Sequence, residues 1–408
     1  MKAYQTQNIR NVVLLGSTKS GKTTLSEAML YEGKVIDRRG TVEAKNTVSD
    51  NAEIEQINQR SIYATPLYAE FMDTKFNIVD TPGADDFVGG AVSAFKVCDT
   101  GVLVVNAQQG VEVGTQIYSR YAREYGIPLI VAVNQLDGEK ASWETTLESM
   151  KEAFGNKPVV VQYPVTVGPD FDGFIDVLKM KYYRFEGDTG KRQDLEIPAD
   201  RLEEAEELRN ALIERAAEYD DTLMETFFEQ GSLSEDEIRK GLGVGIREGK
   251  VMPIFCLSAK KDIGVKRLME FTIRTAASPA ERIGVTKDGK EVECKQDAPV
   301  SIFIYKTAVE PHLGEVAYFK VMSGEEGCGG RFWRPYGFLF TQRFISTFPR
   351  YLHYASSRSY LSRYGGGCAA AGGCIHSRGN GKDFPCSDSV GRAARGARFV
   401  DARRGYGA

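Results

Sequence analysis

Five short apolar runs, each followed within a residue by a glycine or a polar side chain, constrain the fold of residues 1–280 most strongly. Longer amphipathic stretches lie between them. Nearly continuous runs of Val, Ile and Leu are typical of parallel strands that are buried on both faces. The runs are Val12–Leu15, Phe76–Val79, Val102–Val105, Leu129–Val133 and Met252–Leu257. We therefore predict an α/β fold with a mostly parallel sheet, helices on both of its faces, and ligands bound beyond the carboxyl ends of the strands.

The first of these runs leads into GSTKSGKTT, residues 16–24. This segment fits the pattern G-x-x-x-x-G-K-[ST] between a strand and a helix, which is typical of a phosphate-binding P-loop. Its backbone N–H groups and the helix N-terminus favour an anion. We expect Lys22 to reach the β- and γ-phosphates and Thr23 to hold Mg²⁺. The phosphate-binding residues predicted here are Ser17, Thr18, Lys19, Ser20, Gly21, Lys22, Thr23 and Thr24. The alternative is a glycine-rich turn without a ligand.

A second motif, DTPG at residues 80–83, follows the next strand. The carboxylate of Asp80 at a strand end is suited to holding Mg²⁺ through water, and the N–H of Gly83 is suited to meeting a γ-phosphate. An Asp-x-Pro-Gly turn is also common punctuation between elements. Its position one strand after a P-loop favours the nucleotide-binding interpretation.

Two further motifs predict that the base is guanine. In NQLD, Asn134, Gln135 and Asp137 follow a strand, and the Asp137 carboxylate is suited to accepting the two N–H groups of guanine. Adenine lacks that donor pair and would leave the acid unpaired. Ser258, Ala259 and Lys260 follow the last strand and are expected to present a backbone N–H to the guanine O6. Four motifs in this order at strand ends predict a guanine-nucleotide site that binds GTP or GDP.

The composition is that of an ordinary globular protein, with 42% hydrophobic and 26% charged residues. The longest purely apolar runs are far too short to span a bilayer, and the polar N-terminus does not fit a signal peptide. Seven scattered cysteines show no metal-ligand spacing, which indicates a reduced compartment. We expect a cytoplasmic protein that does not contact membrane or DNA.

With these motifs in place, the sequence resembles the translational GTPases, and elongation factor G in particular. GSTKSGKTT is similar to that family's A/G-H-x-D-A-G-K-T-T, DTPGADDF to DTPGHVDF, and NQLD to NKMD. The 120 residues between Asp137 and Ser258 resemble the extra subdomain of elongation factor G. Residues 299–324 look like the opening of that family's β-barrel second domain.

The resemblance implies a division of the chain. A G domain would cover residues 1–155 and 252–280, with an inserted α/β subdomain at 156–251 that includes helices at 202–218 and 221–230. The β-barrel domain would begin at 281–325. The family also implies a ribosome as partner, contact of the inserted subdomain with a ribosomal stalk protein, and a monomer.

The sequence departs from the family pattern at residues that the resemblance assigns to catalysis and nucleotide binding. Ala84 stands where the family has the histidine that orients the attacking water, and the first 311 residues contain no histidine. Lys19 replaces an aspartate, and Gln135 replaces a lysine. Alignment with the family's switch I places Ser61 at the Mg²⁺-binding threonine, so the metal set is Thr23, Ser61 and Asp80. We therefore expect a GTP-binding factor whose hydrolysis is weak or absent, with no intact catalytic residue. The alternatives are an active ribosome-dependent GTPase that promotes translocation, and a non-functional truncated fragment.

A compositional break separates the last part of the chain. Residues 327–408 hold 13 Lys and Arg against 3 acids, whereas the first 326 residues hold 39 against 53. Apolar periodicity stops at the same place. A basic RNA-binding arm is one interpretation. Because the change falls in the middle of the expected barrel, we favour a reading-frame shift, and we expect residues 326–408 not to fold natively.

Overall fold

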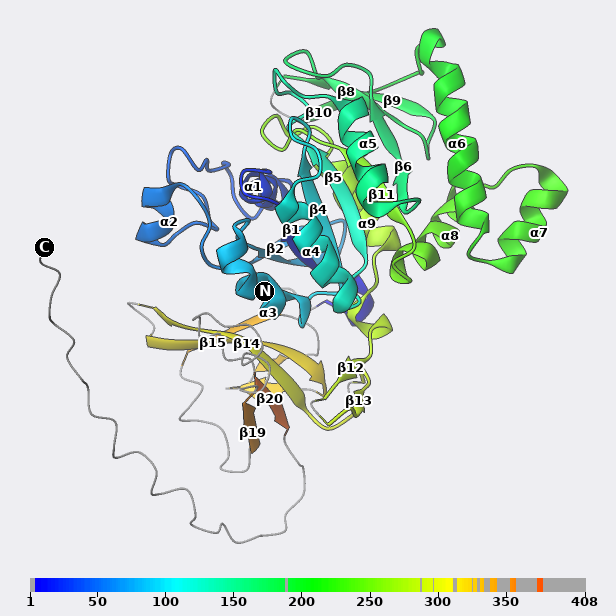
Figure 1. The fold of residues 1–408 in the computed structure, drawn as a ribbon. Helices are drawn as coiled ribbons and strands as arrows, with labels where there is room; N and C mark the ends of the chain where they lie inside the picture. The colour runs from blue at the N-terminus through cyan, green and yellow to red at the C-terminus, as the bar shows by residue number, and fades with distance from the viewer. Residues whose placement is uncertain are drawn as a thin grey trace, which may run out of the picture. The chain divides into compact units, whose positions relative to one another are not determined.

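The computed structural model describes residues 4–324, except for 188–189, 287, 296 and 311–313. Beyond residue 324 it describes only the backbone of five short strands between residues 326 and 376. Figure 1 shows the arrangement. The predicted tail of residues 326–408 therefore lies almost wholly outside the described residues.

A seven-stranded sheet forms the centre of the described chain, in the order β2-β3-β1-β4-β5-β11-β6. All neighbouring strands are parallel except β2 and β3, which form an antiparallel pair. The bounds are β1 Ile9–Leu15, β2 Thr65–Phe71, β3 Thr74–Asp80, β4 Thr100–Asn106, β5 Leu129–Asn134, β6 Pro158–Val160 and β11 Met252–Cys256. Every residue of β4, β5 and β11 is buried, as the apolar runs predict for strands covered on both faces.

Helices cover the two faces of this sheet (Figure 1). Helix α1 contacts α9, and α3 contacts α4. The bounds are α1 Lys22–Glu32, α2 Glu53–Asn58, α3 Val88–Phe95, α4 Val113–Glu124, α5 Trp143–Phe154 and α9 Val265–Thr275. The predicted fold class is confirmed. Because the parallel strands share one carboxyl edge, the loops after β1, β3, β5 and β11 meet there.

The segment between β6 and β11 forms a second, smaller α/β layer. Its antiparallel sheet has the order β10-β9-β8-β7, and its helices are α6 Leu202–Ala217, α7 Asp221–Gln230 and α8 Glu235–Arg247. The strands are β7 Gln162–Pro164, β8 Gly173–Asp176, β9 Lys181–Glu186 and β10 Lys191–Leu195. A fully buried ion pair of 2.6 Å between Arg267 of α9 and Asp176 of β8 joins this layer to the main sheet.

After α9 the chain enters a β-region whose longest strands are β14 Ser301–Glu310 and β15 Gly314–Ser323, which pair antiparallel. A row of polar side chains connects this hairpin to the sheet. Lys320 Nζ lies 2.9 Å from Asp99 Oδ1 and also donates to the Val97 carbonyl. Asp99 Oδ2 accepts from Asn11, whose Oδ1 accepts from Asn77 of β3. The row therefore runs from β15 to the strand that ends in Asp80.

Short strands complete the described backbone. They are β12 Gly284–Val285, β13 Glu291–Val292, β16 Glu326–Cys328, β17 Arg331–Trp333, β18 Phe338–Gln342, β19 His353–Ser356 and β20 Gly373–His376. β18 pairs with β15, and β20 pairs with β14. Among the described residues, no helix has the length and apolarity needed to cross a membrane.

Candidate nucleotide-binding site

The loop between β1 and α1 closes around one ammonium group. Lys22 Nζ donates to the carbonyl oxygens of Gly16 and Ser17, each at 2.9 Å. Gly21 has φ +91°, and a Cβ there would lie 2.3 Å from Nδ2 of Asn134, so only glycine fits between this loop and the loop after β5. The predicted P-loop residues 17–24 thus form one continuous turn and the first turn of α1. In that turn Lys19 is exposed, whereas Lys22 and Thr23 are buried.

Burial lowers the pKa of Lys22 to about 8, and the carboxylates of Asp80, Asp50 and Glu112 oppose that shift. Because Lys22 is buried at a helix N-terminus, few water molecules can hydrate its ammonium group. It is therefore suited to pair with an anion that brings several oxygens.

A set of oxygen atoms lies next to Lys22. Asp80 Oδ2 accepts hydrogen bonds from Thr23 Oγ1 at 2.8 Å and from Ser49 Oγ at 2.7 Å. The hydroxyls of Thr23 and Ser61 are 3.1 Å apart. The other Asp80 oxygen, Oδ1, is buried without a hydrogen-bond partner in the described part of the chain. Of the three predicted metal ligands, Thr23 and Asp80 are therefore hydrogen-bonded to each other, and the Ser61 hydroxyl lies next to that of Thr23.

These residues fit a divalent cation. Burial raises the pKa of Asp80, and it raises the pKa of Asp50, beside Ser61 and Asp80, to about 6. A cation would relieve both buried carboxylates. Within the described residues no three His, Cys, Asp or Glu side chains gather to hold a metal by themselves. Mg²⁺ does not need such a group, because it is commonly held by one or two carboxylates together with phosphate oxygens and water.

The loop after β5 connects the other predicted segments. Asn134 Nδ2 donates to the Ser20 carbonyl and its Oδ1 accepts from the Ala259 N–H, each at 2.9 Å. Gln135, with φ +63°, donates from its side chain to the Lys19 carbonyl at 2.8 Å. The buried amide of Asn134 therefore joins the P-loop to the Ser258–Lys260 turn.

The predicted base-recognition residues lie beside this connection. Asp137 is half-buried, Ser258 is buried and Lys260 is exposed. Asn134 engages the Ala259 N–H, and the Ser258 N–H donates to Ile263. Of the three backbone donors considered for the guanine O6, Lys260 is therefore the one that neither of these bonds engages.

The DTPG turn lies directly against the P-loop. A Cβ at Gly83 would lie 2.5 Å from Lys22 Nζ and 2.7 Å from the Ser17 carbonyl oxygen. The Tyr118 hydroxyl donates to the Pro82 carbonyl at 2.6 Å and fixes the turn. Ala84 follows, half-buried and in an extended conformation.

The acid after Ala84 approaches the P-loop from another side. A Cβ at Gly114 would lie 2.9 Å from Ser17 Oγ and 3.5 Å from Asp85 Oδ1. The Asp85 carboxylate and the Ser17 hydroxyl therefore both lie beside Gly114 of α4, a placement that sequence reasoning did not anticipate.

Sequence reasoning also missed the residues that hold the segment before α2. The buried Glu27 of α1 accepts from the N–H groups of Gly40 and Val48, which brings Ser49 and Asp50 to Asp80. Just before Gly40, Arg39 donates to the Ala259 carbonyl at 3.0 Å. A buried glutamate in a predicted helix is the only sequence signal for this arrangement, and it does not say which backbone groups it binds.

The site combines a glycine-bounded loop, the buried Lys22, the Asp80 carboxylate and the Asn134 amide. This combination defines the class of P-loop nucleotide-binding proteins. Residues 7–278 match the family model of the elongation factor Tu GTP binding domain. The chain therefore belongs to the translational GTPase family built on this domain, and its G domain is a guanine-nucleotide-binding one.

Comparison with individual proteins shows which members of this family the chain resembles. The chain is 32% identical over 323 residues to an "Elongation factor G-like protein" of Thermotoga maritima, covering 78% of this chain and 46% of that protein. A crystal structure of a Thermus thermophilus protein superposes with a TM-score of 0.72 at 28% identity, covering 82% of this chain and 51% of that one. The predicted resemblance to elongation factor G is confirmed. The chain spans about half the length of these relatives.

Proposed function

We propose that this protein is a guanine-nucleotide-binding factor that acts on the ribosome and hydrolyses GTP slowly or not at all. One contrast carries the proposal: Lys22, Thr23 and Asp80 are assembled for phosphate and Mg²⁺, whereas Ala84 presents only a methyl group where the family has histidine. The hydrogen bonds that hold Lys22, Thr23 and Asp80 do not involve the Ala84 side chain, which has no polar atom. Orientation of water by a side chain typically contributes about 10²–10⁴-fold to the rate.

In this proposal the phosphates lie against residues 17–24 and the Gly83 N–H, and Asp137 accepts from the guanine. The bound Mg²⁺ would neutralise charge on the phosphates. Thr23, Ser61 and Asp80 would hold it. Lys22 would place its ammonium between the phosphate oxygens, and the Tyr118 bond to Pro82 would hold Gly83 close to them.

An active ribosome-dependent GTPase is the second candidate, and the position of Asp85 favours it. Its carboxylate and the hydroxyl of the P-loop residue Ser17 both lie beside Gly114, and in this alternative the carboxylate would orient the attacking water. A residue supplied by a partner is another known way to complete such a site.

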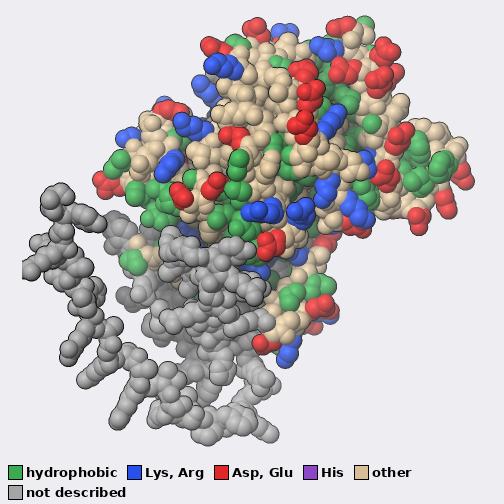
Figure 2. Space-filling view, viewed as in Figure 1, with side chains coloured by type: hydrophobic (Ala, Val, Ile, Leu, Met, Phe, Trp, Pro, Cys, Tyr) green, Lys and Arg blue, Asp and Glu red, His purple; other side chains and the backbone are tan. Residues whose placement is uncertain are grey.

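The inserted subdomain supports contact with another protein. Helix α7 carries an apolar patch rimmed by acidic side chains (Figure 2), and Phe228 of this helix is 78% exposed. We propose that this subdomain binds a ribosomal stalk protein and that the protein works as a cytoplasmic monomer.

Single-turnover hydrolysis of radiolabelled GTP, with and without ribosomes, tests the proposal. A conventional elongation factor G serves as reference, and Lys22→Met serves as the control without nucleotide binding. We expect tight GTP binding and turnover about 10²–10⁴-fold below the reference even on ribosomes. Turnover equal to the reference would contradict the proposal. Loss of that turnover in Asp85→Asn would then assign water positioning to Asp85.

A further inference from the structure

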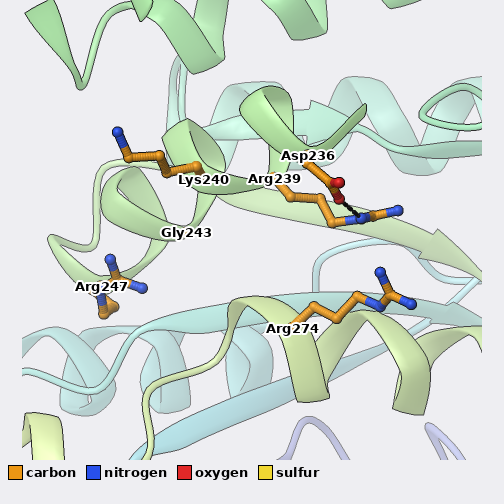
Figure 3. A pocket seen from close by; sticks show the side chains of 6 residues that line it. All are labelled: Asp236, Arg239, Lys240, Gly243, Arg247 and Arg274. Carbon is orange, nitrogen blue, oxygen red and sulfur yellow. Dashed lines mark hydrogen bonds and ion pairs between the residues drawn. The ribbon is translucent and has the colours of Figure 1, made fainter. Parts of the chain in front are cut away.

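Helices α8 and α9 line an open hollow of about 410 Å³, and none of its lining residues belongs to the predicted nucleotide motifs. Its lining is almost entirely polar and cationic: Asp236, Arg239, Lys240, Gly243, Arg247 and Arg274. In Figure 3 the side chains of Arg239 and Arg274 run in the same direction from the two helices, while Lys240 and Arg247 extend on the other side. We refer to this hollow as the α8–α9 groove.

Some of these charges are already compensated. Arg239 pairs with Glu235 and Asp236, and Lys240 pairs with Asp220 at 2.6 Å. Among the described residues no ion pair involves Arg247 or Arg274. Both are exposed, so the groove keeps two cations at its rim.

The wall also contains a buried donor without an acceptor. The Arg239 side chain is 9% exposed, and its Nε has no hydrogen-bond partner in the described part of the chain. Arg267, which does not line the groove, is 2% exposed, and its Nη2 is likewise without one. An unsatisfied buried donor costs about 1–3 kcal/mol. Burial lowers the pKa of Arg239, and the charges of Arg274 and Arg267 lower it further, which indicates a positive potential here.

A glycine inside α8, Gly243, also lines the groove. A Cβ at Gly243 would lie 3.3 Å from Arg247 Nη1. Glycine in a helix interior costs about 1 kcal/mol relative to alanine, so the position is open at some expense to α8. Five of the six lining residues are charged and four of these are cations, so an oxyanion matches both the charges and the fork geometry of arginine.

We propose that the α8–α9 groove is a binding site for a phosphate-class oxyanion, separate from the P-loop. Arg247 and Arg274 contact the anion from the rim, and Arg239 donates from the wall. An RNA phosphodiester and a free phosphate present the same chemical group. The site does not depend on the proposed hydrolytic defect.

The test uses the full chain with Mg²⁺ and saturating GDP, so that the P-loop is filled. One arm measures binding of a fluorescent 12-nucleotide RNA across a salt series, and the other measures inorganic phosphate by its ability to displace that RNA and by calorimetry. The variant is Arg247→Gln with Arg274→Gln, both on exposed side chains. The matched control is Arg120→Gln with Arg123→Gln, two cations of α4.

We expect the groove variant to weaken RNA binding and to make the negative slope of log K against log salt less steep by about two, because each lost phosphate contact removes about one unit. The control variant should leave the slope unchanged. This difference isolates the groove from any binding by the basic C-terminal residues. Phosphate binding that is lost in the groove variant, without an RNA effect, would also support the site and assign a small-molecule source. Binding of both probes that is identical in the two variants would overturn the proposal. Binding of poly-glutamate, a polyanion without phosphate, in the absence of RNA or phosphate binding would also overturn it.

Discussion

Asp137 is the residue on which discrimination between bases depends in the proposed site. It is half-buried beside the bonds that Asn134 makes to Ser20 and Ala259. We expect Asp137→Asn to weaken GDP binding by about 10²-fold or more and to favour xanthosine diphosphate, whose edge offers the complementary donors and acceptors. Competition with unlabelled GDP, XDP and ADP measures the preference. Equal competition by ADP in the wild-type protein would show that the base site is elsewhere.

A second residue-scale prediction concerns Asp262, in the turn that follows Ala259. Burial, together with the nearby Glu32 carboxylate, raises its pKa to about 7. A carboxyl group with a raised folded-state pKa stabilises the fold below about pH 4, and this contribution is lost as the pH rises through 7. We expect the stability difference between wild type and Asp262→Asn to change across this window, with the wild type losing stability relative to the variant. Urea unfolding at fixed Mg²⁺ and GDP between pH 4.5 and 8 measures it. Parallel pH profiles for the two proteins would contradict the assignment.

At the scale of elements, replacing glycine by alanine should have opposite effects on stability in two helices. In α8, a Cβ at Gly241 would lie 2.2 Å from the Ala216 carbonyl oxygen of α6, whereas at Gly89 of α3 no atom lies within 4 Å. Gly241→Ala should destabilise the protein by about 1–3 kcal/mol through overpacking. Gly89→Ala should stabilise it by about 0.5–1 kcal/mol through helix propensity. Denaturant unfolding of the two variants gives both signs, and a loss of stability in Gly89→Ala would argue against the position of α3.

How far sequence predicts structure also varies by element. The strands and the loops at their carboxyl ends follow from uninterrupted Val, Ile and Leu runs, so Lys22, Asp80 and Asn134 could be placed together before any coordinates. Ser49 and Asp50 could not, because their segment has no periodicity. Hydrogen bonds from its backbone to Glu27 position it. The α8–α9 groove could not be predicted either, because it depends on the angle and distance at which two successive helices, on either side of β11 in the sequence, pack together.

At the scale of the whole molecule, one buried ion pair joins the β14–β15 hairpin to the sheet. The side chains of Lys320 and Asp99 are 6% and 0% exposed. Removing one partner of such a pair leaves an uncompensated charge and typically costs about 3–5 kcal/mol. We expect Lys320→Met to be destabilising by this order, and the double variant with Asp99→Asn to lose less than the sum of the two single variants. A double-mutant cycle by chemical unfolding measures the coupling. Additive losses would show that the two charges act independently.

This pairing has a consequence for how the sequence can change over generations. Position 99 lies in the nucleotide-binding part of the chain and position 320 lies in the strands that follow it, and we expect the loss of either charge to destabilise the protein. Among descendants of a common ancestor the two positions should therefore be inherited as a unit. A lineage that exchanged the β-region for one from a distant relative would have to acquire a matching cation or replace the acid. This ion pair therefore links the evolution of the two regions.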